Sequence, residues 1–156
     1  KSNFITINIE GQQINGDYKN AANTIGSKVG IGFFLNKNIN LEASVNTVKV
    51  KNTGIIDRNY FGPEFNIQYL FLPQFKFTPF VYGGFGALLS EYDPFFKANL
   101  GGGFDYLISN SISARTYFQY DFGFKDKLDG FVSGKQNDNI MRIGFGINYY
   151  FGNQQK

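Results

Sequence analysis

The sequence predicts an all-β protein, an eight-stranded antiparallel up-and-down β-barrel that crosses a membrane. Eight segments alternate apolar with polar residues, a period of two that places one set of side chains on each face of a strand. The connections between these segments alternate between long and short. Aromatic residues make up 19% of the chain, which suits strands, and no apolar run approaches the roughly 18 residues of a transmembrane helix.

The segment 140–151 shows the alternation most clearly. Its apolar side chains occupy every second position, at Met141, Ile143, Phe145, Ile147, Tyr149 and Phe151. Glycine or polar residues hold most of the positions between them. Its length of 12 residues exceeds the usual strand of about five or six, and it suffices for a tilted strand that needs roughly 9 to 11 residues to cross a bilayer.

The first half of the chain contains four predicted strands, at about 4–10, 26–35, 39–50 and 60–71. The first alternates isoleucine with polar residues, and the next three set apolar residues against Gly, Lys, Glu, Asn and Ser. Residues 36–38 predict a tight turn, because Asn tolerates left-handed backbone. The polar segments 11–25 and 51–59 are predicted to be long loops.

The second half contains the other four predicted strands, at about 76–89, 96–108, 112–124 and 140–151. Each sets large apolar residues against glycine or charged residues. The segments 72–75 and 109–111 predict short turns, whereas 90–95 and 125–139 predict longer loops. Pro79 cannot donate a hydrogen bond to a neighbouring strand, so we expect it near the rim of the membrane.

The composition limits the classes of protein and of function that this chain could belong to. A chain of 156 residues makes one domain, spanning 1–156. The net charge of +3 is small and scattered, which argues against nucleic acid, and the chain holds neither Cys nor His. The mean hydropathy of −0.24 would suit a soluble protein, but lipid-facing and bore-facing residues average out in a barrel. The sequence enters a strand pattern at once, so, if the protein is exported, we expect this to be its mature or trimmed form.

Charged residues in the middles of the predicted strands lie on the polar face, and we expect that face to line the bore. This predicted network comprises Glu10, Lys28, Glu42, Glu64, Lys97, Asp105, Arg115, Asp121 and Arg142. An eight-stranded bore is only just wide enough for side chains, so the many Phe residues would overfill it. Unpaired buried charges would each cost several kcal/mol, so we expect the five acids and four bases to pair. The alternative is a soluble lipocalin-like carrier with an apolar ligand inside.

A second group supports the membrane orientation. Aromatic residues gather at the short-turn end, at Tyr69, Phe71, Phe75, Phe77, Tyr106, Tyr149 and Phe151. Aromatic girdles of this kind lie at the headgroup level of membrane barrels.

In its architecture the chain resembles the eight-stranded outer-membrane barrels of the OmpA and OmpX type. The stretch 143–151 is similar to the aromatic-ended signal that the barrel-insertion machinery reads in this family. Residues 152–156 follow it, whereas the family signal usually ends the chain, which indicates a tolerated tail or a removed domain. The resemblance implies a bacterial outer membrane, a lipid bilayer as partner, and both termini in the periplasm.

For function, we expect a non-enzymatic structural anchor or a recognition module that displays loops. The enzymes that such barrels resemble use a catalytic histidine, which this chain lacks. A carboxylate pair such as Glu42 and Glu64 is better explained by salt bridges. The alternative is a small-solute or low-conductance pore, but paired charges together with Tyr82, Tyr117 and Tyr150 are expected to plug the bore.

The predicted long loops supply the candidate contact residues. These are Tyr18, Arg58, Tyr92, Phe95, Phe131 and Lys135. Apolar residues flanked by charges suit a protein or glycolipid partner, and solvated loops without a partner are the equal alternative. We expect no cofactor and no metal, because Asp126, Asp129 and Asp138 miss the spacing of a calcium-binding loop.

Overall fold

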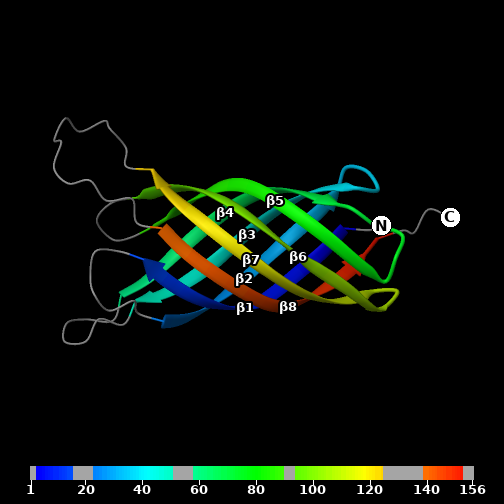
Figure 1. Cartoon of the computed structure of the whole chain (residues 1–156), viewed down its shortest axis with the longest axis horizontal. Helices are drawn as coiled ribbons and strands as arrows, with labels where there is room; N and C mark the ends of the chain where they lie inside the picture. Colours follow the sequence, from blue (N-terminus) through cyan, green and yellow to red (C-terminus); the bar gives the residue numbers. More distant parts are fainter. Residues whose placement is uncertain (1–2, 16–22, 51–57, 90–93, 125–138, 153–156) are drawn as a thin grey trace.

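The computed structural model describes residues 3–15, 23–50, 58–89, 94–124 and 139–152, which form a closed antiparallel barrel (Figure 1). Its strands are β1 (Asn3–Asn15), β2 (Asn23–Phe34), β3 (Ile39–Val50), β4 (Arg58–Leu70), β5 (Phe77–Leu88), β6 (Phe95–Ser109), β7 (Ile112–Phe124) and β8 (Asn139–Phe151). They follow one another around the barrel, and β8 pairs with β1 to close it. Eight strands in this order confirm the predicted fold.

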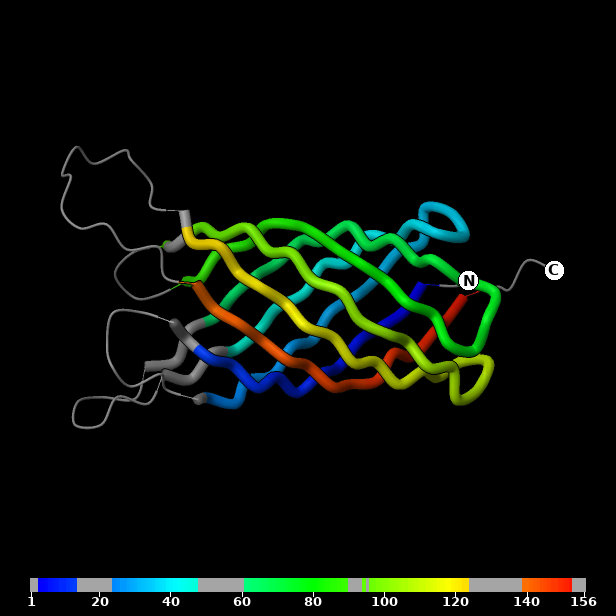
Figure 2. The backbone as a smooth tube through the Cα atoms, in the orientation of Figure 1, coloured from blue at the N-terminus to red at the C-terminus, as the bar shows by residue number. Residues whose placement is uncertain are grey.

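The two ends of the barrel differ. Short connections at 35–38, 71–76 and 110–111 lie together at one end, named here the turn end, where β1 starts and β8 finishes (Figure 2). The opposite end is named the far end. Among the residues that the structure describes, no helix is long and apolar enough to cross a membrane.

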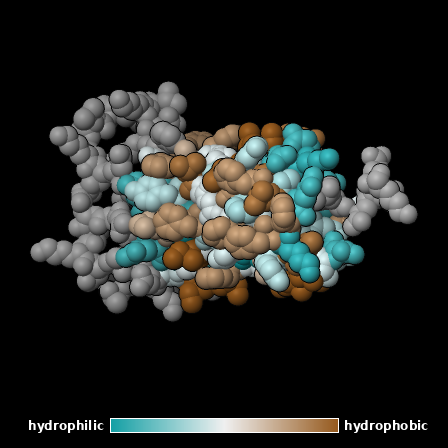
Figure 3. Space-filling model, turned by 45° about the vertical axis from the view of Figure 1, so that its right-hand side comes forward, coloured by the Kyte–Doolittle hydropathy of each residue, from teal (hydrophilic) through white to brown (hydrophobic). Residues whose placement is uncertain are grey.

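Large apolar side chains point outward along the barrel wall. Ile7, Phe85 and Phe145 are 59%, 67% and 64% exposed, and similar residues spread over the flank between the two ends (Figure 3). The buried side chains of the described interior are mostly charged, amide or hydroxyl groups. A lipocalin-like barrel needs the reverse arrangement, so that alternative is wrong. The outward apolar wall is the surface of a transmembrane barrel.

Two predicted loop segments belong to strands instead. β1 runs on to Asn15 and β2 already begins at Asn23, so the predicted loop 11–25 was too long. Gln12 pairs with Thr24, and the two side chains are 3% and 6% exposed inside the barrel. A polar bore lets polar residues continue the ladder, so the lack of apolar alternation there did not mark a loop.

Smaller corrections concern three strand ends. Arg58 and Phe95, predicted in loops, are the first residues of β4 and β6. Ser109, predicted in a turn, ends β6, where its pairing with Ile112 follows a shift in register. Pro79 is the third residue of β5, close to the turn end, and its carbonyl accepts a hydrogen bond from Phe71 N–H at 3.0 Å.

Glycines on the bore face make room for rings that lie flat against the wall. A Cβ at Gly32 would lie 2.1 Å from the ring of Phe4, and one at Gly144 would lie 2.2 Å from the ring of Tyr117. Side chains larger than hydrogen at these positions would therefore displace the rings into a bore that has little spare width.

An apolar cluster inside the barrel was predicted only in part, since the sequence interpretation placed Tyr82 and Tyr117 in the bore but not the residues packed with them. Leu70 and Phe80 are 1% and 2% exposed, and they pack with Tyr82 and Tyr117 against Phe34. Phe4 is fully buried and its ring centroid lies 5.8 Å from that of Phe34. The bore is therefore not lined by polar residues and glycine alone. Their place in the sequence could have revealed them, because they occupy those alternate positions of their strands that face the bore.

Candidate functional site in the bore

Nine charged side chains meet inside the barrel. They are 0% to 5% exposed and each forms at least one ion pair: Glu10, Lys28, Glu42, Glu64, Lys97, Asp105, Arg115, Asp121 and Arg142. They come from every strand except β5. The alternation of each strand aims them at the axis, and the closed pairing of β1 with β8 brings the first strand against the last.

The cluster nearer the turn end centres on Arg115. Its guanidinium donates to Asp105 through Nε at 2.8 Å and Nη2 at 2.9 Å, a bidentate contact across the β6–β7 ladder. Its Nη1 donates to Glu42 at 2.9 Å, and Gln68 donates its amide to the same Glu42 oxygen at 2.5 Å. Charge-assisted forks of this kind are strong and fix side-chain orientation.

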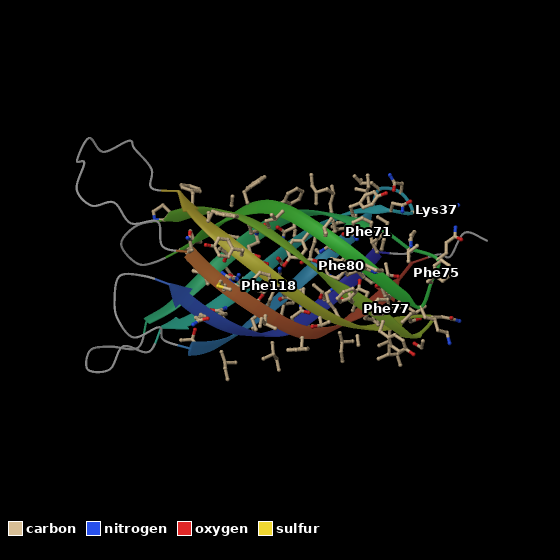
Figure 4. The ribbon with its side chains drawn as sticks, viewed as in Figure 1. Lys37, Phe71, Phe75, Phe77, Phe80 and Phe118 are labelled. Carbon is tan, nitrogen blue, oxygen red and sulfur yellow. The ribbon has the colours of Figure 1, made fainter. Side chains whose placement is uncertain are left out.

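Rings hold this cluster from the turn end. The Arg115 guanidinium carbon lies 4.6 Å from the ring centroid of Phe80 and 5.3 Å from that of Phe4. Cation–π contacts at this range stabilise a buried cation. Figure 4 shows Phe80 within the barrel, whereas Phe71, Phe75 and Phe77 lie at the turn end.

The cluster nearer the far end centres on Glu64, which forms ion pairs with Lys97 and Arg142. Lys97 also contacts Asp121 at 2.8 Å. Arg142 lies 3.3 Å from Glu64, 3.4 Å from Glu10 and 2.7 Å from Asp121. The Arg142 Nη2 that approaches Asp121 is not aligned for a hydrogen bond, so this contact is electrostatic.

A pair of tyrosines separates the two clusters. The rings of Tyr82 and Tyr117 meet edge to face, with centroids 6.2 Å apart and planes at 76°. The Tyr82 hydroxyl donates to Gln119 at 2.9 Å, and the Tyr117 hydroxyl donates to Glu10 at 2.5 Å. Both hydroxyls therefore add donors to the far-end cluster, while the rings form an apolar layer across the bore.

Lys28 joins the two clusters through this layer. Its ammonium lies 3.5 Å from Glu42 on one side and 3.3 Å from Glu64 on the other. It also lies 5.8 Å from the ring centroid of Tyr82 and 5.4 Å from that of Tyr117. With this link, all nine charges form one continuous network.

A small cavity lies within the network. It lies beside Lys28, measures ≈ 10 Å³ and is lined by residues of the turn-end cluster and of the tyrosine layer, among them Glu42, Arg115 and Tyr117. That is about the volume needed for one water molecule. In the part of the chain that the structure describes, no group of three or more Asp, Glu, His or Cys could hold a metal ion.

The structure describes only two of the six candidate contact residues, and those two by their backbone. Tyr18, Tyr92, Phe131 and Lys135 lie outside the described residues. Arg58 and Phe95 begin β4 and β6, and the structure describes their backbone but not their side chains. The structure therefore brings the nine charges together, and it leaves the contact residues as a prediction from sequence.

The aromatic residues predicted at the short-turn end lie on the outer wall there. Tyr69, Phe77 and Tyr149 are 43%, 49% and 53% exposed. Phe77 stacks on Phe104, with ring centroids 4.9 Å apart. Exposed aromatic rings at one level of a barrel wall mark a membrane interface.

No family model matches the sequence, and no curated protein matches it in sequence. Solved structures do match in fold. Neisserial surface protein A superimposes with a TM-score of 0.77 at 10% identity, over 97% of this chain and 98% of that chain. Ail, the attachment invasion locus protein of Yersinia pestis, matches with a TM-score of 0.63 at 15% identity, over 96% and 98%. Outer membrane protein OprG from Pseudomonas aeruginosa matches with 0.58 at 14% identity, over 97% of both chains.

This chain has the fold of the small eight-stranded outer-membrane barrels. The three matched structures share nearly their full length with it, so the likeness extends to the whole barrel and confirms the predicted OmpA- and OmpX-like architecture. At identities of 15% or less, the likeness concerns the fold alone.

Proposed function

We propose that this outer-membrane-type barrel is a non-enzymatic anchor in the bacterial outer membrane that presents recognition segments at its far end. Its first partner is the lipid bilayer, which meets the apolar wall. β1 begins and β8 ends at the turn end of the barrel (Figure 1). This arrangement supports a periplasmic location for both termini. The aromatic residues that end β8 support insertion by the outer-membrane route.

The closed bore carries the proposal. A pore needs a continuous water-filled path. Against such a path stand Lys28 and the two tyrosines, which meet in the bore beside a cavity of ≈ 10 Å³. An ion that passed would have to separate charges that are paired and buried, at a cost of several kcal/mol for each group.

The bore also lacks the groups expected of an enzyme. The chain contains no His and no Cys, so the usual pairing of nucleophile and base is missing. Glu42 is held by Lys28 and Arg115, and Glu64 by three cations, which leaves neither carboxylate free as a general base. Both side chains are at most 2% exposed, so substrate does not reach them.

Recognition would fall to the far end. The six candidate contact residues combine aromatic rings with cationic groups, which suits a protein or glycolipid surface. Ail has been solved in complex with a heparin analogue, sucrose octasulfate. That complex makes an anionic sugar the first ligand to test on this barrel.

Conductance across a planar bilayer tests the closed bore. The purified barrel, shown to be inserted by its heat-dependent gel shift, is expected to give no stepwise current above the bare bilayer. Discrete, reproducible channels from the wild-type protein would overturn the anchor assignment in favour of a pore.

Binding to immobilised sucrose octasulfate and to whole host-cell surfaces tests recognition. Lys135→Ala is expected to weaken binding without altering the gel shift. Lys37→Ala is the matched control, because Lys37 is an exposed lysine in the turn between β2 and β3, at the opposite end of the barrel (Figure 4). Equal loss in both variants would show non-specific charge attraction instead of recognition at the far end.

A further inference from the structure

The ladder between β4 and β5 contains a gap within the barrel wall. Phe61 and Leu89 exchange both backbone hydrogen bonds, at 3.4 Å and 2.8 Å. Regular pairing resumes at Glu64 opposite Gly86, in the same register. The two intervening residues of β4, Gly62 and Pro63, pair with β3 but have no ladder partner on β5.

Pro63 explains the gap. Hydrogen-bonded pairs alternate along an antiparallel ladder, so the pair after Phe61 and Leu89 would be Pro63 and Ala87. Proline has no N–H, and therefore β4 offers no donor to the Ala87 carbonyl. In a membrane no bulk water can replace that donor, and an unsatisfied carbonyl is strongly unfavourable there.

A groove of ≈ 830 Å³ lies on the outer wall at the same place. Its lining comes from β1 to β6, and small apolar side chains form its middle: Val29, Ala43, Val45, Pro63 and Ala87. Pocket volumes between roughly 300 and 1,000 Å³ are usual for small-molecule sites. The gap in the ladder and the groove therefore share Pro63 and Ala87.

Residues at bore-facing positions also take part in the lining of the groove. These are Gly30, Ser44, Glu64 and Gly86. Where outward side chains are small, the backbone itself forms the floor. Large neighbours border it, with Phe65 39% exposed and Phe85 67% exposed.

We propose that this groove binds the acyl chain of a membrane lipid that bears a chain hydroxyl. The groove is continuous with the apolar wall, so hydrocarbon is the medium that reaches it. The hydroxyl donates a hydrogen bond to the Ala87 carbonyl, the acceptor that Pro63 leaves without a donor from β4. This site goes beyond anchoring and recognition at the far end, because it lies within the bilayer and selects one kind of lipid chain.

Photolabelling in phosphatidylcholine vesicles tests the proposal. Two photoreactive fatty acids of equal length are compared, one with a mid-chain hydroxyl and one without, and labelled residues are found by peptide mass spectrometry. On the wild-type barrel, labelling is expected at the groove, for example at Ala43 and Val45. The hydroxylated probe should saturate the groove at a concentration about two- to twelve-fold lower, the worth of one net hydrogen bond.

Two pairs of variants separate the parts of the site, each checked for folding by its gel shift. Pro63→Ala supplies the missing N–H, so the two probes should saturate alike, whereas Pro79→Ala should keep the preference. Ala43→Phe fills the groove and should lower labelling by both probes more than about tenfold, whereas Ala114→Phe, on the outer wall of β7 away from the groove, should not. If Ala43→Phe does not fold, Val45→Phe replaces it.

Three results would overturn the proposal. One is labelling spread evenly over the apolar wall, which would show ordinary annular lipid. Another is equal saturation by the two probes on the wild-type barrel. The last is a hydroxyl preference that survives in Pro63→Ala.

Discussion

Arg115→Met tests how much the bore depends on its ion pairs. Methionine keeps most of the side-chain volume between Phe4 and Phe80, so packing changes little while the cation is lost. Asp105 has Arg115 as its ion-pair partner, and it would remain buried at 4% exposure without it. Breaking a buried pair by removing one partner costs about 3–5 kcal/mol, so we expect a loss of that size in the free energy of unfolding.

The matched double variant separates the effect of the unpaired charge on stability from the effect of the changed side-chain volume. Arg115→Met combined with Asp105→Asn removes both charges of the bidentate pair, so no carboxylate is left unpaired there. Glu42 keeps its contact with Lys28 at 3.5 Å. Replacing a whole buried pair is often close to neutral, and we therefore expect the double variant to be more stable than Arg115→Met alone.

Reversible urea unfolding in lipid vesicles, followed by far-ultraviolet circular dichroism, measures both effects. The unfolding midpoint should fall clearly for Arg115→Met and recover in the double variant, with a coupling of at least about 1.5 kcal/mol, the size of a charged hydrogen bond. A single variant within about 0.5 kcal/mol of wild type, the usual range of a surface substitution, would refute the network as a source of stability.

Two further substitutions test the packing of the bore and the lipid-facing wall. Gly144→Ala places a methyl group 2.2 Å from the Tyr117 ring and should destabilise the barrel by about 1–3 kcal/mol in the same unfolding assay. Gly83→Ala is the control, because the atoms nearest to its new methyl group lie 3.7 Å away, and it should be neutral or stabilising. A neutral Gly144→Ala would show that the ring moves freely. Ile143→Arg should impair insertion into vesicles, with a cost of about 2–4 kcal/mol near the bilayer midplane, whereas Leu72→Arg at the turn end should cost at most about 1 kcal/mol. A soluble, folded Ile143→Arg would mean that the wall does not face lipid.

The number and order of the strands could be predicted because alternation carries most of the information. β3 and β7 begin and end at the predicted residues, and along most of each strand apolar residues alternate with polar or charged ones. Prediction was poorest at the far ends of β1 and β2, because Gln12 and Thr24 are polar in a bore that accepts polar residues, and Gln13 is polar on the outer face. Hydrophobicity marks a strand only where one face meets an apolar medium.

The nine bore charges could be predicted because they occupy the alternate strand positions that face the bore. Their ion-pair partners could not be predicted. Alternation gives the face of a residue and says nothing of height along the axis, which depends on strand tilt and register around the barrel. Lys28 illustrates this, since its position between two clusters follows from the β1–β2 and β2–β3 registers together. The gap at Pro63 was equally hidden, because it requires knowledge of which β5 residue lies opposite.

The network has a consequence for how the chain enters a membrane. Glu10 on β1 meets Arg142 on β8, which follows it 132 residues later. A curled sheet that lacks its final strand would leave Glu10 without its ion-pair partner, and Glu64 and Asp121 each with one cation fewer. Such an assembly intermediate is disfavoured, so penetration of the bilayer and joining of the first and last strands must occur together. The interior thereby makes assembly all-or-none.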